Sequence, residues 1–216
     1  MTHLVLLGDS IFDNAAYTSG GPDVCSQVKR LLPPSWNATL LAVDGSTTIN
    51  IPGQMDRLPN DATHLILSVG GNDALTEASR LGISPFNFQS PSPSPSLSAL
   101  ADISDTFALH YRQAIAACLN TRLPLAVCTI YNGCFFDPFQ QRIASTALTI
   151  FNDVIIRVAI EHSLPIIDLR PICSTPADYA NPIEPSSIGG EKIAKAIVAL
   201  VTVSASARGT RLVSGA

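Results

Sequence analysis

The sequence predicts an α/β protein of three layers (α/β/α), in which helices cover both faces of a parallel β-sheet. Two observations lead to this prediction. Five short apolar runs recur along the chain, and segments with helical periodicity lie between most of them. Strands that alternate with helices are joined by right-handed crossovers, which makes the strands parallel and buries both faces of the sheet.

The predicted elements follow from residue type and spacing. Runs of aliphatic and β-branched residues are typical of strands buried on both faces. The predicted strands are Leu4–Leu7, Thr39–Val43, Leu65–Val69, Leu125–Ile130 and Pro165–Ile167. Apolar residues three and four positions apart form one buried helix face. The predicted helices are Val24–Leu32, Leu97–Leu119, Gln140–Ile160 and Ile188–Val201.

Two segments interrupt this pattern. Pro and Ser alternate in the second half of residues 84–96, and because proline lacks an amide hydrogen this stretch cannot be helical. We expect a loop that either flanks a ligand site or is a plain surface insertion. The helical periodicity is lost after Thr202, so residues 205–216 are expected to be a disordered tail. The sequence thus predicts one domain, residues 1–204, with the loop inserted into it.

The composition narrows the classes of function. The chain has 216 residues, of which 46% are hydrophobic and 14% charged, and its formal net charge is −4. This balance gives no basic footprint for nucleic acid, and a small neutral or weakly polar ligand fits it better. No apolar stretch is expected to reach the length that spans a bilayer, and no export signal precedes the first strand, so we expect a cytoplasmic protein.

Metal and phosphate sites are not predicted either. Cys and His residues do not occur at the spacing of metal ligands, and the glycine pair Gly70-Gly71 is followed by Asn-Asp and by no lysine. We therefore expect no metal and no cofactor.

Short polar motifs follow three of the predicted strands. Gly8-Asp9-Ser10 comes directly after the first strand, where Ser10 is either a nucleophile or a helix N-cap. Gly45 follows the second strand, and Gly70-Gly71-Asn72-Asp73 follows the third. Parallel strands bring these motifs to one edge of the sheet. Acyl transfer needs such an edge, with a hydroxyl to attack and preorganised donors for the oxyanion.

With these blocks in this order, the chain resembles the SGNH (GDSL-type) hydrolases, a family of serine esterases, lipases and related acyl hydrolases. The resemblance spans residues 3 to about 201. It implies a flavodoxin-like fold with a five-stranded parallel sheet and a small-molecule ester as substrate. It also implies that Ser10 is the nucleophile and that the Ser10 amide, the Gly45 amide and the Asn72 side chain form an oxyanion hole. The G-x-S-x-G elbow of the α/β-hydrolases is absent around Ser10.

The last block departs from the family pattern. The family has Asp-x-x-His-Pro before its final helix, and the matching stretch here is Asn181-Pro182-Ile183-Glu184-Pro185. Glu184 therefore stands at the position of the base histidine, and Asn181 at the position of the aspartate that orients it. The usual triad is missing.

Three interpretations of this departure remain open. In the favoured one, Glu184 is the general base for Ser10, burial raises its pKa, and Asn181 or Asp178 orients it. A second interpretation recruits a base from elsewhere in the chain, where the histidines are His3, His64, His110 and His162. A third is an inactive SGNH-fold protein that binds a small acylated or carbohydrate ligand.

Neighbouring residues complete the predicted site. Asp9 and Asp73, beside Ser10 and Asn72, and Tyr131, at the end of the fourth strand, are expected to contact the substrate. Asn152 is interpreted as structural, with its side chain bonded to a loop.

Overall fold

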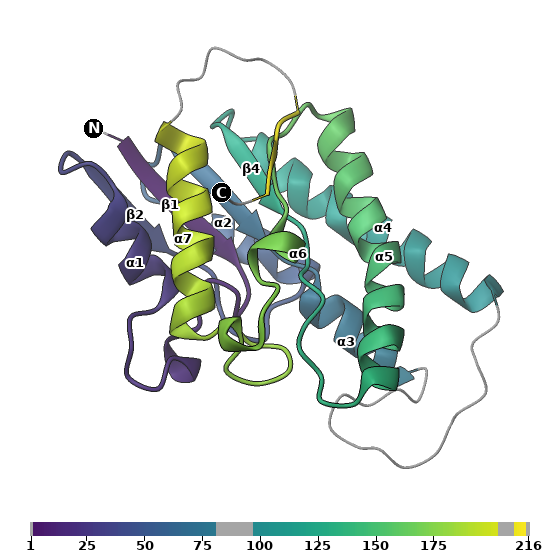
Figure 1. The fold of residues 1–216 in the computed structure, drawn as a ribbon. Helices are drawn as coiled ribbons and strands as arrows, with labels where there is room; N and C mark the ends of the chain where they lie inside the picture. The colour runs from purple at the N-terminus through teal and green to yellow at the C-terminus, as the bar shows by residue number, and fades with distance from the viewer. Residues whose placement is uncertain (1, 81–96, 203–209, 215–216) are drawn as a thin grey trace.

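In the computed structural model, which describes residues 2–80, 97–202 and 210–214, six parallel strands form one sheet in the order β2-β1-β3-β4-β5-β6 (Figure 1). Their bounds are β1 Thr2–Gly8, β2 Trp36–Leu40, β3 His64–Ser68, β4 Leu125–Cys128, β5 Ile166–Ile167 and β6 Leu212–Val213. The central strand β1 pairs with β2 and β3, and Leu6 lies opposite both Leu40 and Ile66. This register brings the carboxyl ends of β1 and β3 side by side.

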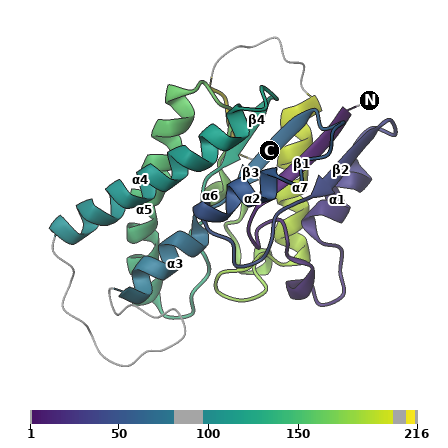
Figure 2. The same ribbon diagram turned by 180° about the vertical axis from the view of Figure 1, so that it is seen from behind.

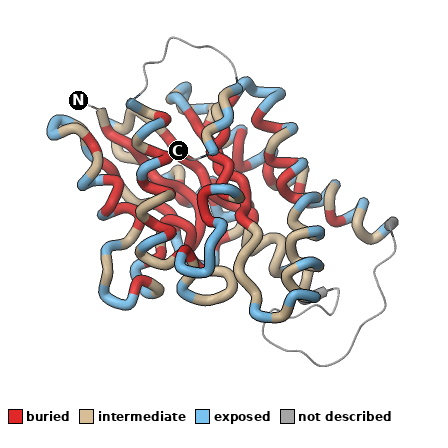
Figure 3. The backbone as a smooth tube through the Cα atoms, in the orientation of Figure 1, coloured by how far each residue is buried: buried red, intermediate tan, exposed pale blue. Residues whose placement is uncertain are grey.

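Both faces of the sheet are buried. Along β1, Leu4 and Leu6 pack into one core cluster, while Val5 and Leu7 pack into the other. Figure 3 shows the buried residues concentrated in the central strands. This arrangement follows from the alternation of side chains along a strand, and it explains why β1 is apolar at each position from Leu4 to Leu7.

Seven α-helices of the described residues make up the two outer layers. The first layer contains α1 (Val24–Leu31), α6 (Leu169–Ile172) and α7 (Ser187–Thr202), which pack on Leu4 and Leu6. The second contains α2 (Ile51–Met55), α3 (Gly71–Arg80), α4 (Leu97–Leu119) and α5 (Pro138–Glu161), on the side of Val5 and Leu7. Figure 1 is seen from the α1–α7 side, and Figure 2 from the side of α2, α3 and α4. Short 3₁₀ turns cover Ala15–Tyr17, Thr48–Asn50 and Pro176–Asp178.

The predicted fold class is confirmed, and most elements lie where the sequence places them. The helix predicted at Leu97–Leu119 has those bounds in the structure. The second strand lies three residues earlier than predicted, at Trp36–Leu40, because its pairing with Thr2–Leu6 sets its bounds. The segment 84–96 lies outside the described residues.

Three expectations need correction. Helix α3 begins at Gly71, where the sequence predicted no helix. The sheet has six strands rather than five, since Leu212–Val213 pairs with β5, so residues 212–213 are not part of a disordered tail. By length and composition α5 could cross a membrane, with a mean hydropathy of 1.6 over its most apolar window. About 33% of that window is buried in the fold, where residues such as Val154 and Ile155 pack into the core between the sheet and α4.

Candidate active site

The turn that carries Ser10 is fixed by its neighbours on both sides. Gly8 ends β1 with φ +131°, and a Cβ atom there would lie 1.8 Å from the Ser68 carbonyl oxygen, so only glycine fits. The buried side chain of Gln54, on α2, accepts from the Gly8 amide at 2.8 Å and donates to the Gly8 carbonyl at 2.7 Å. After the turn, the Ile11 amide donates to Asp9 Oδ1 at 3.1 Å. Ser10 therefore sits on backbone that α2 and β3 hold in place.

Ser10 is not a helix N-cap. The amides of Phe12 and Asp13 both donate to the Asp9 carbonyl, which closes a tight turn, and the next helical residues begin only at Ala15. Ser10 is buried, with 6% of its surface exposed. The capping interpretation of this serine is therefore wrong.

A second fixed turn carries Glu184. The Asn181 side-chain oxygen accepts from the amides of Ile183 and Glu184, both at 2.9 Å. The Tyr131 hydroxyl donates to the Ile183 carbonyl at 2.7 Å, and Asn14 Nδ2 donates to the Pro185 carbonyl at 3.2 Å. Because Asn14 lies just after the Ser10 turn, these bonds hold the Glu184 turn against it.

The expected orienting groups act differently from the prediction. Asn181 orients the backbone of Glu184 rather than its carboxyl group. Asp178 is fully buried and bound elsewhere: it accepts from the amides of Ser174 and Thr175, and its Oδ1 lies 2.6 Å from Lys192 Nζ. The interpretation of Asp178 as a residue that orients Glu184 has no support in these contacts.

The carboxyl groups near Ser10 take up protons more readily than ordinary ones. Burial raises the pKa of Glu184 to about 7, although a hydrogen bond with Ser10 lowers it in part, and the nearby charge of Asp44 raises it further. Burial also raises the pKa of Asp9 to about 8, with contributions from the charges of Glu184 and Asp73. At neutral pH Asp9 is thus mainly neutral, while Glu184 is divided between its two forms.

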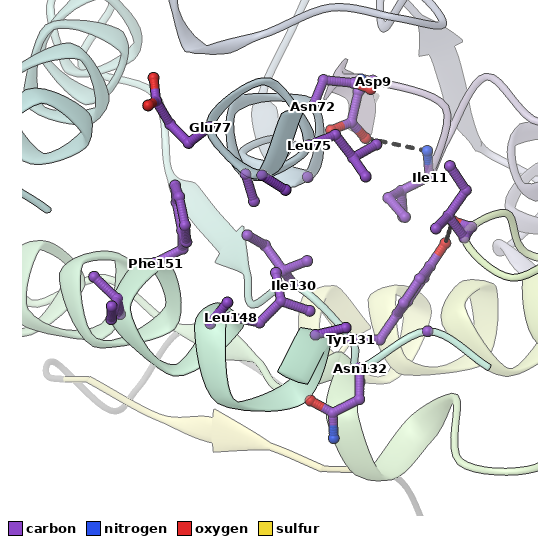
Figure 4. A pocket seen from close by; sticks show the side chains of 18 of the residues that line it. Asp9, Ile11, Asn72, Leu75, Glu77, Ile130, Tyr131, Asn132, Leu148 and Phe151 are labelled. Atoms are coloured by element: carbon purple, nitrogen blue, oxygen red, sulfur yellow. Dashed lines mark hydrogen bonds between the residues drawn. The ribbon is translucent and has the colours of Figure 1, made fainter. Parts of the chain in front are cut away.

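Ser10 and Glu184 line the same cavity, which has a volume of about 160 Å³. Its polar lining near Ser10 includes Asp9 and Asn72. Most of the remaining wall is apolar and comes from α3, α4, α5 and the segment after β4, including Leu75, Ile103, Ile130, Ala147, Leu148 and Phe151. In Figure 4, Leu75, Ile130, Leu148 and Phe151 are among the labelled side chains that surround the cavity. The cavity can hold an apolar chain next to a serine hydroxyl.

The predicted oxyanion donors are only partly brought together. Asn72 lines the cavity, and one hydrogen of its carboxamide donates to the Ser46 carbonyl at 3.0 Å, which leaves the second hydrogen for a ligand. Gly45 is exposed on the adjacent turn and is not among the described residues that line the cavity.

The expected substrate contacts divide in the same way. Asp9 and Tyr131 line the cavity. Asp73 instead accepts from the Thr48 amide and from its hydroxyl, the latter at 2.6 Å, and so it anchors the 3₁₀ turn at Thr48–Asn50.

The histidines are remote from the Ser10 hydroxyl. His3 and His64 lie at the starts of β1 and β3, at the opposite end of the sheet, and His162 directly follows α5. His110 is on α4; burial raises the pKa of Asp73, and the nearby charge of His110 offsets a part of that rise. No histidine occurs among the described residues that line the cavity, so an imported histidine base has no support.

Sequence reasoning missed the contacts by which two residues, Gln54 and Asn14, build the site. Gln54 bonds to the backbone of a residue 46 positions away, and Asn14 to the backbone of a residue 171 positions away. No local sequence pattern predicts either contact. The structural interpretation of Asn152 is confirmed, since its carboxamide bonds both the amide and the carbonyl of Ile130 at 2.7 and 2.8 Å. Within the described ranges, His, Cys, Asp and Glu form no group of three that could hold a metal ion.

Comparisons with solved structures support the fold. An extracellular lipase from Streptomyces rimosus superposes with a TM-score of 0.68 at 16% identity, covering 93% of this chain and 98% of that one. An aryl esterase from M. smegmatis gives 0.64 at 14% identity, and a phospholipase A1 from Streptomyces albidoflavus gives 0.64 at 15%, each covering 93% of this chain and 98% of the other. These identities are low, so the likeness concerns the fold.

A search among proteins with curated descriptions found no significant match. Residues 6–188, by contrast, match the family model described as the GDSL-like Lipase/Acylhydrolase family. This match covers most of the chain, including the Ser10 turn, Asn72 and the Glu184 turn. The chain therefore belongs to the GDSL-like lipase/acylhydrolase family.

Proposed function

We propose that this protein hydrolyses carboxylic esters through a covalent acyl-enzyme, with Ser10 as nucleophile and Glu184 as general base. The observation that carries the proposal is that both side chains are buried in the lining of one largely apolar cavity, where Ser10 is close enough to lower the pKa of the Glu184 carboxyl. Family membership supports the reaction class. The substitution of Glu for His changes the identity of the base and leaves the attacking group unchanged.

In the proposed reaction the Ser10 hydroxyl attacks the acyl carbon while its proton moves to the Glu184 carboxylate. The ester C–O bond then breaks, and the leaving alcohol takes that proton from Glu184. Water attacks the acyl-serine in the second half, again with Glu184 as base, and releases the carboxylic acid. A base with a pKa of about 7 is suited to this cycle, because it can accept and return a proton near neutral pH.

The oxyanion that forms during attack needs donors beside Ser10. The second carboxamide hydrogen of Asn72 and the Ser10 amide are the proposed donors. Gly45 is proposed as a third, since the turn that carries it adjoins Ser46, whose carbonyl holds Asn72 in place.

The cavity suggests the part of the substrate that fits there. Its wall beyond Ser10 consists mainly of aliphatic side chains, which favour an apolar acyl chain over a charged or sugar group. We therefore favour an ester with an aliphatic acyl group, and the alternative of an inactive protein that binds an acylated ligand differs in turnover alone.

The test compares the native protein with Ser10→Ala and with the matched control Ser98→Ala, an exposed serine on α4. We expect a fluorophosphonate to label the native protein and Ser98→Ala once, and Ser10→Ala not at all, as read by intact-protein mass spectrometry. Turnover of p-nitrophenyl butyrate should be lost only in Ser10→Ala. Equal labelling and turnover in all three proteins would remove Ser10 from the reaction, and the absence of both in the native protein would favour the binding protein.

A further inference from the structure

The segment between β4 and α5 presents aromatic side chains to solvent at the rim of the cavity. Phe136 is 102% exposed and Phe139 is 58% exposed, whereas Phe135 and Gln140, directly on either side, line the cavity. Asp137 caps α5 by accepting from the Phe139 amide at 3.0 Å, which fixes the turn that displays the two rings. Two phenylalanines held in water beside an acyl-sized cavity are unfavourable unless something apolar covers them.

A polar groove that includes Arg142 adjoins the Phe139 ring. Its lining combines guanidinium, hydroxyl and carboxamide groups, from Asn132, Arg142, Ser145, Thr146, Thr149, Asn152 and Arg170. The Arg142 guanidinium lies 5.8 Å above the Phe139 ring and is exposed, and Arg170 is paired with Asp168 at 2.7 Å. Asn132 belongs to the walls of both hollows, and in Figure 4 its carboxamide points away from the side chains around the cavity.

This combination favours a particular partner. The exposed Arg142 guanidinium is suited to a phosphate oxygen, on a chain whose net charge is −4. The Arg170 guanidinium is bound to Asp168, and the hydroxyls of Thr146 and Thr149 donate to carbonyls of their own helix. Exposed aromatic rings beside phosphate-binding groups match the boundary of a phospholipid bilayer, where acyl chains lie directly beneath the headgroup phosphates. A second copy of the chain fits less well, because a two-fold contact through this surface would bring like-charged guanidiniums together.

We propose that Phe136, Phe139 and Arg142 form a docking surface for a phospholipid bilayer, with a headgroup phosphate against the exposed Arg142 guanidinium. The surface lies on the membrane and α5 does not cross it. The inference extends the proposed function, since docking would place the mouth of the acyl cavity against the source of apolar ester substrates. It is independent of the catalytic residues.

The test measures flotation of the full chain with vesicles of diether phosphatidylcholine, which has no ester bond and cannot be hydrolysed. We expect the native protein to float with the vesicles. The double variant Phe136→Ser/Phe139→Ser should bind at least about tenfold more weakly, because each buried ring contributes that much or more. Arg142→Gln should bind several-fold more weakly.

The matched controls lie on the same helix. Ile160→Ser removes a side chain that is 57% exposed near the other end of α5, and Arg157→Gln removes an exposed guanidinium. Both should bind like the native protein. Absence of binding by the native protein, or equal loss in the controls, would overturn the proposal. Loss of a dimer in the double variant by light scattering, without vesicle binding, would assign the surface to a second copy instead.

Turnover of a soluble ester separates this proposal from the proposed function. The double variant should hydrolyse p-nitrophenyl butyrate at the native rate, since neither ring lines the cavity. A native protein that floats with vesicles but fails to hydrolyse the soluble ester would refute the esterase and leave the docking surface standing.

Discussion

Glu184 lines the same cavity as Ser10, and in the proposed reaction its carboxyl takes the part that an imidazole has in the family pattern. The change matters chiefly for pH, since a carboxyl becomes a useful base only when its surroundings raise its pKa. Here burial brings the value to about 7. One oxygen, Oε2, is buried without a hydrogen-bond partner among the described residues, an environment that favours the protonated form.

The pH dependence of ester turnover therefore tests the role of Glu184. The base must be ionised to accept a proton, so kcat/KM should rise with pH through an apparent pKa near 7 and level off above it. Glu184→Gln should lower kcat by about a hundredfold or more, the scale of a lost general base.

The control for this variant is Glu191→Gln, which changes a carboxylate on α7 that is paired with Lys195 and lies away from the cavity. Its profile should match that of the native protein. A Glu184→Gln variant with unchanged activity, or a native profile that is flat from pH 5 to 9, would exclude the carboxylate as base.

At the scale of elements, two buried carboxamides tie the ends of strands to helices behind the sheet. Gln54 on α2 bonds both polar groups of Gly8, and Asn152 on α5 bonds both polar groups of Ile130. Each replaces the ladder bonds that a strand loses where it leaves the sheet. The turns that follow, toward Ser10 and Tyr131, start from a fixed peptide.

Removing the Gln54 carboxamide should lower both the stability of the fold and the activity of the site. Gln54→Leu has a similar volume but removes the partner of the buried Gly8 amide and one of the two donors to the Gly8 carbonyl, which keeps the Val43 amide. We expect a loss of about 1–3 kcal/mol in the free energy of unfolding. We also expect a lower kcat, because the Ser10 turn is no longer anchored. Urea unfolding followed by fluorescence measures the first effect, and Gln113→Leu, on the exposed face of α4, is the control. Equal stability of the two variants would show that the hydrogen bonds of Gln54 to Gly8 are dispensable.

The same elements show how far the sequence determines the fold. Strand β1 and helix α4 were predictable because their apolar spacing is unbroken. Helix α3 was not, since Gly70-Gly71-Asn72-Asp73 has the composition of a turn although it starts a helix. Strand β6 has two residues, which are too few to show a hydrophobic periodicity in the sequence, and it is defined by its pairing with β5.

The site divides along similar lines. Ser10, Asn72 and Glu184 were predictable from local motifs, and the structure brings them to one cavity. Gln54 and Asn14 act through contacts between distant parts of the chain, which only the folded topology creates.

At the scale of the whole molecule, the buried carboxyl of Asp9 links stability to pH. Its pKa is about 8 in the fold against an ordinary value of 3.8, so the native state holds a proton that the unfolded chain releases between these values. The Asp9 contribution is therefore fully present below about pH 4 and is lost as pH rises through about 8.

Asp9→Asn should remove this dependence while keeping the acceptor for the Ile11 amide. Relative to the variant, the native protein should lose more than about 1 kcal/mol of unfolding free energy between pH 5 and pH 9. Chemical denaturation at several pH values measures the difference, and the exposed Asp56→Asn should follow the native curve. Parallel curves for the native protein and Asp9→Asn would mean that Asp9 is ionised throughout.

The outermost strand β6 has a consequence for solubility. The Arg211 carbonyl, directly before β6, accepts from the Ile166 amide at 2.7 Å, and the Val213 carbonyl accepts from the Asp168 amide at 2.8 Å. These bonds close the free side of β5. A chain cut before residue 210 would present those two amides, next to the buried Ile166 and Ile167, as an open sheet edge. Open edges of this kind accept strands from other molecules. These few residues would then decide whether the protein stays dispersed at high concentration or aggregates, even though they lie far along the sheet from Ser10.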